Sequence, residues 1–263
     1  MLRKLGSFLI NPSRYIFPHQ ILSIADYERG KVDLYVEDIW PAAQGQILLD
    51  AGAGNFRFRE SIKSKGYEYQ SQDFTDGFDA DSRGKHTYTC DIEDIPVKSN
   101  YFDAILCAQV LEHLPRPSVA FLEFSRILKP GGNLYLTTNF LFPIHGAPYD
   151  FYRFTKFSLE QLSNSVGLTV INLKPRGGFF ALVAKVIYDF PEVFRSSLFY
   201  GGADPHGPRV IRLQRISTAL PIVPLIFILD LMCTSTAFLV SSMDFLDRKQ
   251  RFTLGYQLTA KKD

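Results

Sequence analysis

A short apolar run that ends on an acid and breaks into glycines constrains the fold of this chain most. Residues 47–49 lead into Asp50, and Gly52 and Gly54 follow at once. A buried strand that stops at a glycine turn is how an open α/β sheet makes a crevice for a nucleotide-sized ligand. Glycine also lets the backbone approach a ligand more closely than any Cβ would permit. Residues 56–64 are expected to form the helix after the turn.

The rest of the chain alternates strands and helices. Asp73 ends the second expected strand, 19 residues after Gly54, and Asp91 ends the third. Rossmann-type units place an acid for ribose hydroxyls at about 20 residues from the glycine turn. The order indicates a mostly parallel sheet with helices on both sides. The expected strands after the first are 67–72, 86–90, 101–107, 134–138, 168–174 and 253–260, and further helices are expected at 118–128 and 158–166.

Together these motifs resemble the class I S-adenosylmethionine-dependent methyltransferases, in the branch that includes quinone-pathway enzymes. One position departs from the family pattern, because Phe56 stands where many members carry a third glycine. The resemblance implies a Rossmann-like fold whose seven-stranded, mostly parallel sheet has an antiparallel last strand. The motifs that carry it are residues 49–54, Asp73, residues 90–96, Phe102-Asp103, residues 110–114 and residues 128–132.

Four segments are expected from this likeness and from the composition. They are an N-terminal helical cap at 1–44, the S-adenosylmethionine-binding core at 45–175, a hydrophobic helical insertion at 176–250, and the last strand of the core sheet at 251–263.

The resemblance also implies the residues that bind S-adenosyl-L-methionine. Asp73 would accept hydrogen bonds from both ribose hydroxyls, because a carboxylate offers two oxygens. Asp91 would contact the adenine together with the backbone of Ile92, although a cap for the segment that begins at Ile92 is an alternative role for Asp91. The full expected set is Asp50, Gly52, Gly54, Asp73, Asp91 and Ile92.

The segment 139–155 follows the fifth strand, where ligands of open α/β sheets bind. It sets a few polar side chains among aromatics and prolines. His145 is the leading candidate for a catalytic base because its ordinary pKa lies near working pH, and Asp150 would orient it or replace it. His113 is a second candidate for the base and is otherwise expected to line the site. The expected substrate-binding residues are His113, Tyr152 and Arg153, and Arg153 has pairing with Asp150 as an alternative role.

A hydrophobic stretch, residues 216–243, lies in the insertion and contains one charged residue, Asp230. Basic residues flank it on both sides, at 209, 212 and 215 and at 248, 249 and 251. Pro221, Pro224 and Asp230 are expected to interrupt it, so a single membrane span is not expected. A hairpin or helix in the membrane interface is one interpretation, with peripheral contact through 216–243. A buried helix pair or a dimer interface is the other.

Composition supports a small-molecule enzyme. The net charge of +2 gives no general attraction to nucleic acid. Three widely spaced cysteines predict reduced thiols, and no Cys or His spacing predicts a metal site. We expect a cytoplasmic protein, which would lie at the inner face of the membrane if it contacts lipid.

The expected function is therefore S-adenosylmethionine-dependent methylation of a small or lipid-linked acceptor, including a saccharide, at oxygen. The alternative is a non-catalytic cofactor-binding or membrane-binding or partner-binding module on the same fold. A dinucleotide-dependent dehydrogenase fits less well, because the turn lacks the three-glycine fingerprint.

Overall fold

The computed structural model describes residues 41–74, 85–199 and 222–263. The chain divides into two compact units, one built on a sheet and ending at Arg176 before resuming at Gly255, the other containing Gly177–Leu254. The expected N-terminal cap at 1–44 falls outside the described residues except for its last four positions. It therefore stays a prediction.

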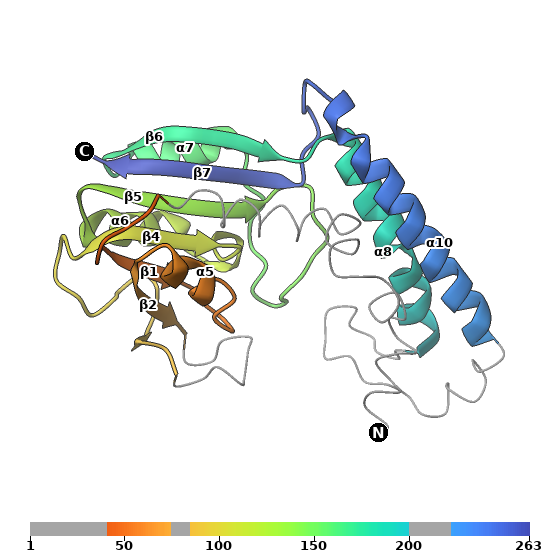
Figure 1. Ribbon diagram of the computed structural model, residues 1–263, viewed down its shortest axis with the longest axis horizontal. Coiled ribbons are helices and arrows are strands. Elements are labelled where there is room, and N and C mark those ends of the chain that lie inside the picture. Colours follow the sequence, from red (N-terminus) through yellow and green to blue (C-terminus); the bar gives the residue numbers. More distant parts are fainter. Residues whose placement is uncertain (1–40, 75–84, 200–221) are drawn as a thin grey trace. The chain divides into compact units, whose positions relative to one another are not determined.

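In its described residues the sheet unit contains seven strands and three α-helices, most of them labelled in Figure 1. The strands are β1 (Ile47–Ala51), β2 (Glu68–Asp73), β3 (Tyr88–Thr89), β4 (Phe102–Ala108), β5 (Leu128–Asn139), β6 (Leu168–Arg176) and β7 (Gly255–Lys262). The helices are α5 (Arg59–Ser64), α6 (Pro117–Ile127) and α7 (Lys156–Asn164), with a short 3-10 turn, η1 (Leu111–His113), after β4.

The strand order is β3-β2-β1-β4-β5-β7-β6. Strands β1 to β5 pair in parallel, and β7 runs antiparallel to both of its neighbours, β5 and β6. This confirms the expected Rossmann-like sheet with an antiparallel last strand. Parallel strands bring their carboxyl ends to one edge, so the segments after β1, β2, β3, β4 and β5 meet there.

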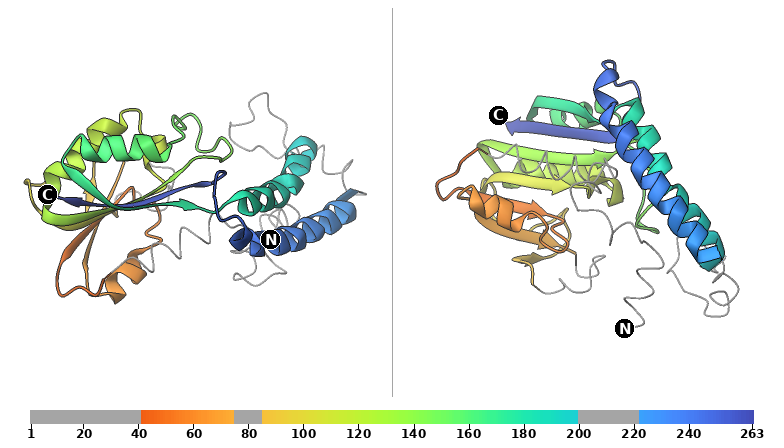
Figure 2. Two further views of the ribbon diagram at one scale, coloured as in Figure 1. Left: turned by 90° about the horizontal axis from the view of Figure 1, so that it is seen from above. Right: turned by 45° about the vertical axis from the view of Figure 1, so that its right-hand side comes forward.

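Both faces of the sheet are covered, as the views in Figure 2 show. On one face α6 and α7 bury Phe121, Phe124 and Leu159 against β4, β5 and β7. On the other face α5 packs Ile62 against β1 and β4. The apolar runs of the central strands are therefore buried on both sides, as parallel strands require.

Two boundaries differ by three or more residues from those predicted. The helix after the glycine turn begins at Arg59 and not at residue 56, because Phe56 has a φ of 61° and therefore cannot lie within a right-handed helix. Strand β5 begins at Leu128, which pairs with Phe102, and not at residue 134. Its first residues had been expected to end a helix.

The described part of the helical unit contains α8 (Phe179–Phe199), α10 (Val223–Ser242) and a 3-10 turn, η3 (Asp244–Leu246). Helices α8 and α10 pack against each other. The carboxylate of Asp244 accepts hydrogen bonds from the backbone N–H groups of Gly178 and Ala181, and that of Asp247 accepts one from Phe179. These contacts satisfy the free N–H groups at the start of α8 and tie the two ends of the unit together.

The apolar segment expected at 216–243 is described from residue 222 onward, and there it forms one continuous helix. The expected interruption at Pro224 and Asp230 is wrong, because Pro224 lies in the first turn, where a missing N–H is tolerated. Within the described ranges one helix, Pro224–Leu246, is long and apolar enough to cross a membrane, with a mean hydropathy of 1.8. Buried core helices meet the same criterion of length and composition.

Candidate active site

The glycine turn after β1 is fixed to the end of β2. The N–H of Gly52 donates to the backbone carbonyl of Gln72 at 2.9 Å and to its side-chain oxygen at 3.1 Å. Gly52 has a φ of +74°, and a Cβ there would overlap the side chain of Val110. Both the backbone conformation and the lack of space therefore require glycine at this position.

Asp73 sits at the end of β2 beside the turn, as expected. One carboxylate oxygen accepts the N–H of Gly54 at 2.6 Å, and the other accepts the N–H of Phe74 at 2.7 Å. Each oxygen can accept a second hydrogen bond, so the carboxylate can still bind two hydroxyl donors. A Cβ on Gly54 would meet nothing within 4 Å, so space is open beside the carboxylate.

Asp50 lies beneath this edge and not at its surface. Its side chain is buried, and the hydroxyl of Tyr69 donates to it at 2.8 Å. Burial raises the pKa of Asp50 to about 7, the Tyr69 hydrogen bond opposes that rise, and the charge of Asp73 adds to it. This placement suits a residue that orients the turn, and a contact of Asp50 with the cofactor stays a prediction.

Asp91 and Ile92 follow β3. The carboxylate of Asp91 is exposed and accepts the N–H of Glu93 at 3.0 Å, which forms an Asx turn; residues 92–98 contain no helix, so the helix-capping role considered for Asp91 is wrong. Ile92 is buried. The adenine contact of this pair stays a prediction.

These residues fit the cofactor that the sequence motifs imply. The open space beside Gly54 and the remaining acceptor capacity of Asp73 suit a ribose, and the exposed Asp91 is free of any ion pair within the described residues. Asp73, the glycine turn, Asp91 and the backbone of Ile92 would hold the adenosyl group.

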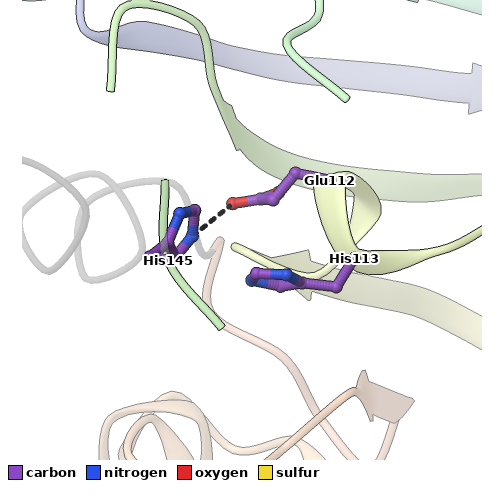
Figure 3. A group of neighbouring side chains, drawn as sticks. All are labelled: Glu112, His113 and His145. Atoms are coloured by element: carbon purple, nitrogen blue, oxygen red, sulfur yellow. Dashed lines mark ion pairs between the residues drawn. The ribbon is translucent and has the colours of Figure 1, made fainter. Parts of the chain in front are cut away.

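A second group of polar side chains lies at the same edge, after β4 and β5. Glu112, His113 and His145 each place a nitrogen or oxygen atom within 4.8 Å of the other two (Figure 3). His145 Nε2 lies 3.9 Å from a carboxylate oxygen of Glu112, and the rings of the two histidines are 4.7 Å apart. Because Gly52 contacts Val110, which precedes η1, this group is connected to the glycine turn.

Glu112 is fully buried at the base of the group. The hydroxyl of Thr138 and the amide of Asn139 donate to its two oxygens at 2.9 and 2.8 Å. Burial raises the pKa of Glu112, whereas a hydrogen bond from its own backbone, the neighbouring His113 and the Thr138 hydroxyl oppose the rise. The nearby charge of Arg176, which donates to the carbonyl of Thr138, also opposes it.

His145 is held by the loop that follows β5. The backbone N–H of His145 donates to Asp150, and Asp150 forms a bidentate ion pair with Arg153 at 2.6 and 2.8 Å. Burial lowers the pKa of His145, as does the neighbouring His113, while Asp150 opposes the shift, so the imidazole is neutral at pH 7. The lone pair of the neutral ring is then at Nε2, which lies 3.4 Å from the side-chain amide nitrogen of Asn139 and would have to exchange that contact for a proton or a cation.

Asp150 and Arg153 brace this loop. Their ion pair lowers the pKa of Asp150 to about 2, so its carboxylate is a poor proton acceptor near neutral pH. Arg153 also donates to the carbonyls of Phe142 and Pro143. Two roles were considered for each of these residues. The geometry favours Asp150 as the residue that orients His145, and Arg153 as the partner of Asp150.

Of the other two expected substrate-binding residues, His113 belongs to this group and Tyr152 follows the loop that holds His145. Tyr152 is exposed, and its hydroxyl donates to the carbonyl of Pro115 at 3.1 Å. His113 contacts Tyr149 through Nδ1, which lies 2.5 Å from the Tyr149 carbonyl oxygen. Contacts of either residue with a substrate stay a prediction.

Two residues of the site were missed by sequence reasoning. The buried side chain of Gln72 accepts from Gly52 and donates to the carbonyl of Cys90 at 2.7 Å, so it joins the ends of three strands. Glu112 is the second. Gln72 and Glu112 are polar residues on or just after apolar strands, and this position was the signal that could have identified them. Buried polar groups need hydrogen-bond partners and often mark functional sites.

Comparison with known proteins places this geometry in a family. Residues 49–136 match the family described as "Methyltransferase domain". A ubiquinone biosynthesis O-methyltransferase of Coxiella burnetii is 29% identical over 156 residues, covering 49% of this chain and 66% of the relative. The chain thus spans just under two thirds of the length of that relative.

Two solved structures share the fold. One is phosphoethanolamine N-methyltransferase 2 of Haemonchus contortus in complex with S-adenosyl-L-methionine, with 14% identity, a TM-score of 0.50, and coverage of 89% of this chain and 52% of that one. The other is the [4+2]-cyclase SpnF, with 17% identity, a TM-score of 0.51, and coverage of 88% and 79%.

The strand order, the glycine turn followed by Asp73, and the matched residues agree with one another. Residues 49–136 therefore form a methyltransferase domain within a sheet that has the class I S-adenosylmethionine-dependent methyltransferase fold, and S-adenosylmethionine is the cofactor of that domain.

Proposed function

We propose that this protein transfers a methyl group from S-adenosylmethionine to a hydroxyl oxygen of a small or lipid-linked acceptor. The observation that carries the proposal is the meeting of two groups at one sheet edge, the glycine turn with Asp73 and the cluster of Glu112, His113 and His145. The first suits the adenosyl group, and the second offers a neutral imidazole for the acceptor. Oxygen methylation is also the activity in the name of the Coxiella relative.

Bound S-adenosylmethionine supplies a methyl group on a sulfonium, which is electrophilic without further activation. The protein must hold the acceptor oxygen in line and remove its proton. His145 Nδ1 is held by the carbonyl of Pro143 at 3.2 Å, so Nε2 carries the lone pair and would accept that proton. Glu112, 3.9 Å away, would stabilise the imidazolium that forms.

The helical unit supports a lipid-linked acceptor. Along α10 the buried stripe is mostly small or polar, whereas Met232 and Leu239 on the outer side are each 62% exposed. A helix made for water has the opposite arrangement. Polar residues inside and apolar residues outside are typical of helices that face lipid. The buried stripe is Ile226, Asp230, Thr234, Ala237 and Ser241.

Basic residues at the end of this unit point to the same partner. Arg248, Lys249 and Arg251 are exposed in the segment that follows η3. Each basic residue near an anionic membrane surface contributes about 1 kcal/mol of attraction. We therefore propose peripheral contact of α8 and α10 with the cytoplasmic leaflet, which would bring the enzyme to an acceptor in that leaflet.

Cofactor binding and methyl transfer can be tested on one preparation of the full chain. We expect calorimetric titration to show S-adenosylmethionine binding, weakened on the order of 100-fold in Asp73→Asn, since hydrogen bonds to a charged group contribute about 1.5–3 kcal/mol each. Asp94→Asn, an exposed acid at the same edge, is the matched control and should bind normally.

The acceptor is tested with radiolabelled S-adenosylmethionine and bacterial lipid extract. Label should enter the organic phase with the wild-type chain, and His145→Ala should lower turnover far more than cofactor affinity. Label found only in water-soluble products would favour a free small molecule over a lipid-linked one. Cofactor binding with no transfer to either fraction would favour the non-catalytic module.

A further inference from the structure

We propose that Glu112, His113 and His145 form a binding site for a divalent transition-metal cation. One potential ligand atom from each lies within 4.8 Å of the other two (Figure 3). Metal bonds of about 2.1 Å in tetrahedral geometry place ligand atoms about 3.4 Å apart. The widest pair in the cluster would need to close by up to about 1.4 Å, which side-chain rotation can supply.

Both imidazoles are held in the way that metal-binding histidines usually are. Nδ1 of His113 lies 2.5 Å from the carbonyl oxygen of Tyr149, and Nδ1 of His145 lies 3.2 Å from that of Pro143. A carbonyl oxygen only accepts, so each Nδ1 carries the proton and each Nε2 carries the lone pair. A second nitrogen fixed by a backbone carbonyl orients the ring and raises its basicity toward a metal.

Glu112 supplies the charge that a cation needs. It is fully buried, and its hydrogen-bond donors, Thr138 and Asn139, are both neutral. Among the described residues, His145 lies 3.9 Å from a carboxylate oxygen of Glu112, and the charges of His113 and Arg176 also act on that carboxylate. A cation bound directly to a buried carboxylate stabilises its charge, and each oxygen of Glu112 keeps one lone pair for a metal.

The donor set selects the class of cation. Two imidazoles and one carboxylate suit Zn²⁺, Fe²⁺, Co²⁺ or Ni²⁺, whereas Mg²⁺ and Ca²⁺ prefer oxygen ligands alone. Three protein ligands leave a coordination position open, as in catalytic metal sites.

The open position gives the site a role that rests on the proposed function. It would take the acceptor oxygen and make its hydroxyl easier to ionise, with the proton passing to solvent. In the metal-bound state His145 is then a ligand and not the base.

The site can be tested by titrating the full chain with Co²⁺, without S-adenosylmethionine or acceptor. We expect one Co²⁺ per chain, a visible absorption band from the bound ion, and its displacement by Zn²⁺. His113→Ala and His145→Ala should each weaken the affinity by at least about tenfold, as even residues that only support metal ligands do when removed. His86→Ala, which removes a described histidine outside the cluster, should bind as the wild type does.

S-adenosylmethionine titration of the same samples separates this proposal from the proposed function. Cofactor binding without saturable Co²⁺ binding, or an equal loss of Co²⁺ affinity in all three variants, would overturn the metal site and leave methyl transfer standing. Co²⁺ binding lost in the two cluster variants would support the metal site even in a preparation that binds no cofactor.

Discussion

The two units of this chain use their apolar side chains in opposite ways. In the sheet unit Phe121 and Phe124 are fully buried, and polar side chains gather at one edge of the sheet. In the helical unit Asp230 is buried, while Met232 and Leu239 are exposed. The first arrangement makes a core that is stable in water and exposes chemistry at its rim. The second leaves its apolar surface for another environment, so chemistry and location are carried by different units.

The test of this contrast with the largest expected effect compares two side chains, each replaced by alanine. Phe121→Ala opens a cavity in the sheet core and should lower the free energy of unfolding by about 3–5 kcal/mol. Leu239→Ala removes an exposed side chain and should change it by less than about 0.5 kcal/mol. Urea unfolding followed by circular dichroism measures both. Equal losses would mean that Leu239 packs in a core and that the contrast is false.

A buried acid makes the sheet unit sensitive to pH. The folded pKa of Asp50 is raised to about 7, above its ordinary value of 3.8, so the folded state binds more protons than the unfolded state between these values. Stability should therefore be greatest below about pH 4 as far as Asp50 contributes, and fall as the pH rises toward 7. The difference is at most about 4 kcal/mol.

Asp50→Asn keeps the shape and removes the titration. We expect the loss of stability between pH 5 and pH 8 to shrink in Asp50→Asn and to be unchanged in Asp94→Asn, an exposed acid of the same unit. Urea midpoints at the two pH values are the measurement. The same pH dependence in Asp50→Asn and the wild type would contradict a buried, protonated Asp50.

The sequence predicts the sheet unit well because its signals are local. An apolar run buried on both faces identifies β4 within one residue, and Asp73 ends β2 as expected. The start of α5 could not be predicted, since the positive φ of Phe56 depends on how the turn packs.

The second half of the site is harder to predict because it joins distant residues. His145 lies 32 positions beyond His113, and the loop that returns it is held by the Asp150–Arg153 ion pair. Periodicity carries no information on such a loop. No metal site was therefore predicted from the sequence at these residues.

The helical unit can be tested against lipid directly. Replacing both Met232 and Leu239 by Gln should weaken flotation with anionic vesicles by at least about tenfold, because each apolar side chain moved from water contributes about 1.5–3 kcal/mol when fully buried. Phe157→Gln, an exposed apolar residue on α7 in the sheet unit, is the matched control. Normal flotation of the double variant would favour a partner or dimer interface over lipid.

The smallest effect concerns the one position where the sheet unit departs from its family. Phe56 keeps a φ of 61° although it is not glycine, and its ring stacks on His86 at 4.6 Å. A residue with a Cβ in the left-handed conformation destabilises the folded state by about 1–2 kcal/mol. Glycine avoids this strain, but its greater freedom in the unfolded chain offsets about 0.4–1 kcal/mol of the gain. Phe56→Gly should therefore be about 1 kcal/mol more stable than Phe56→Ala, since both lose the ring and only one keeps the strain. At Lys63, within α5, the same pair should give the opposite sign, because alanine is favoured over glycine in a helix. If glycine is no better than alanine at position 56, the turn relaxes without its third glycine, and the backbone beside Asp73 is not strained.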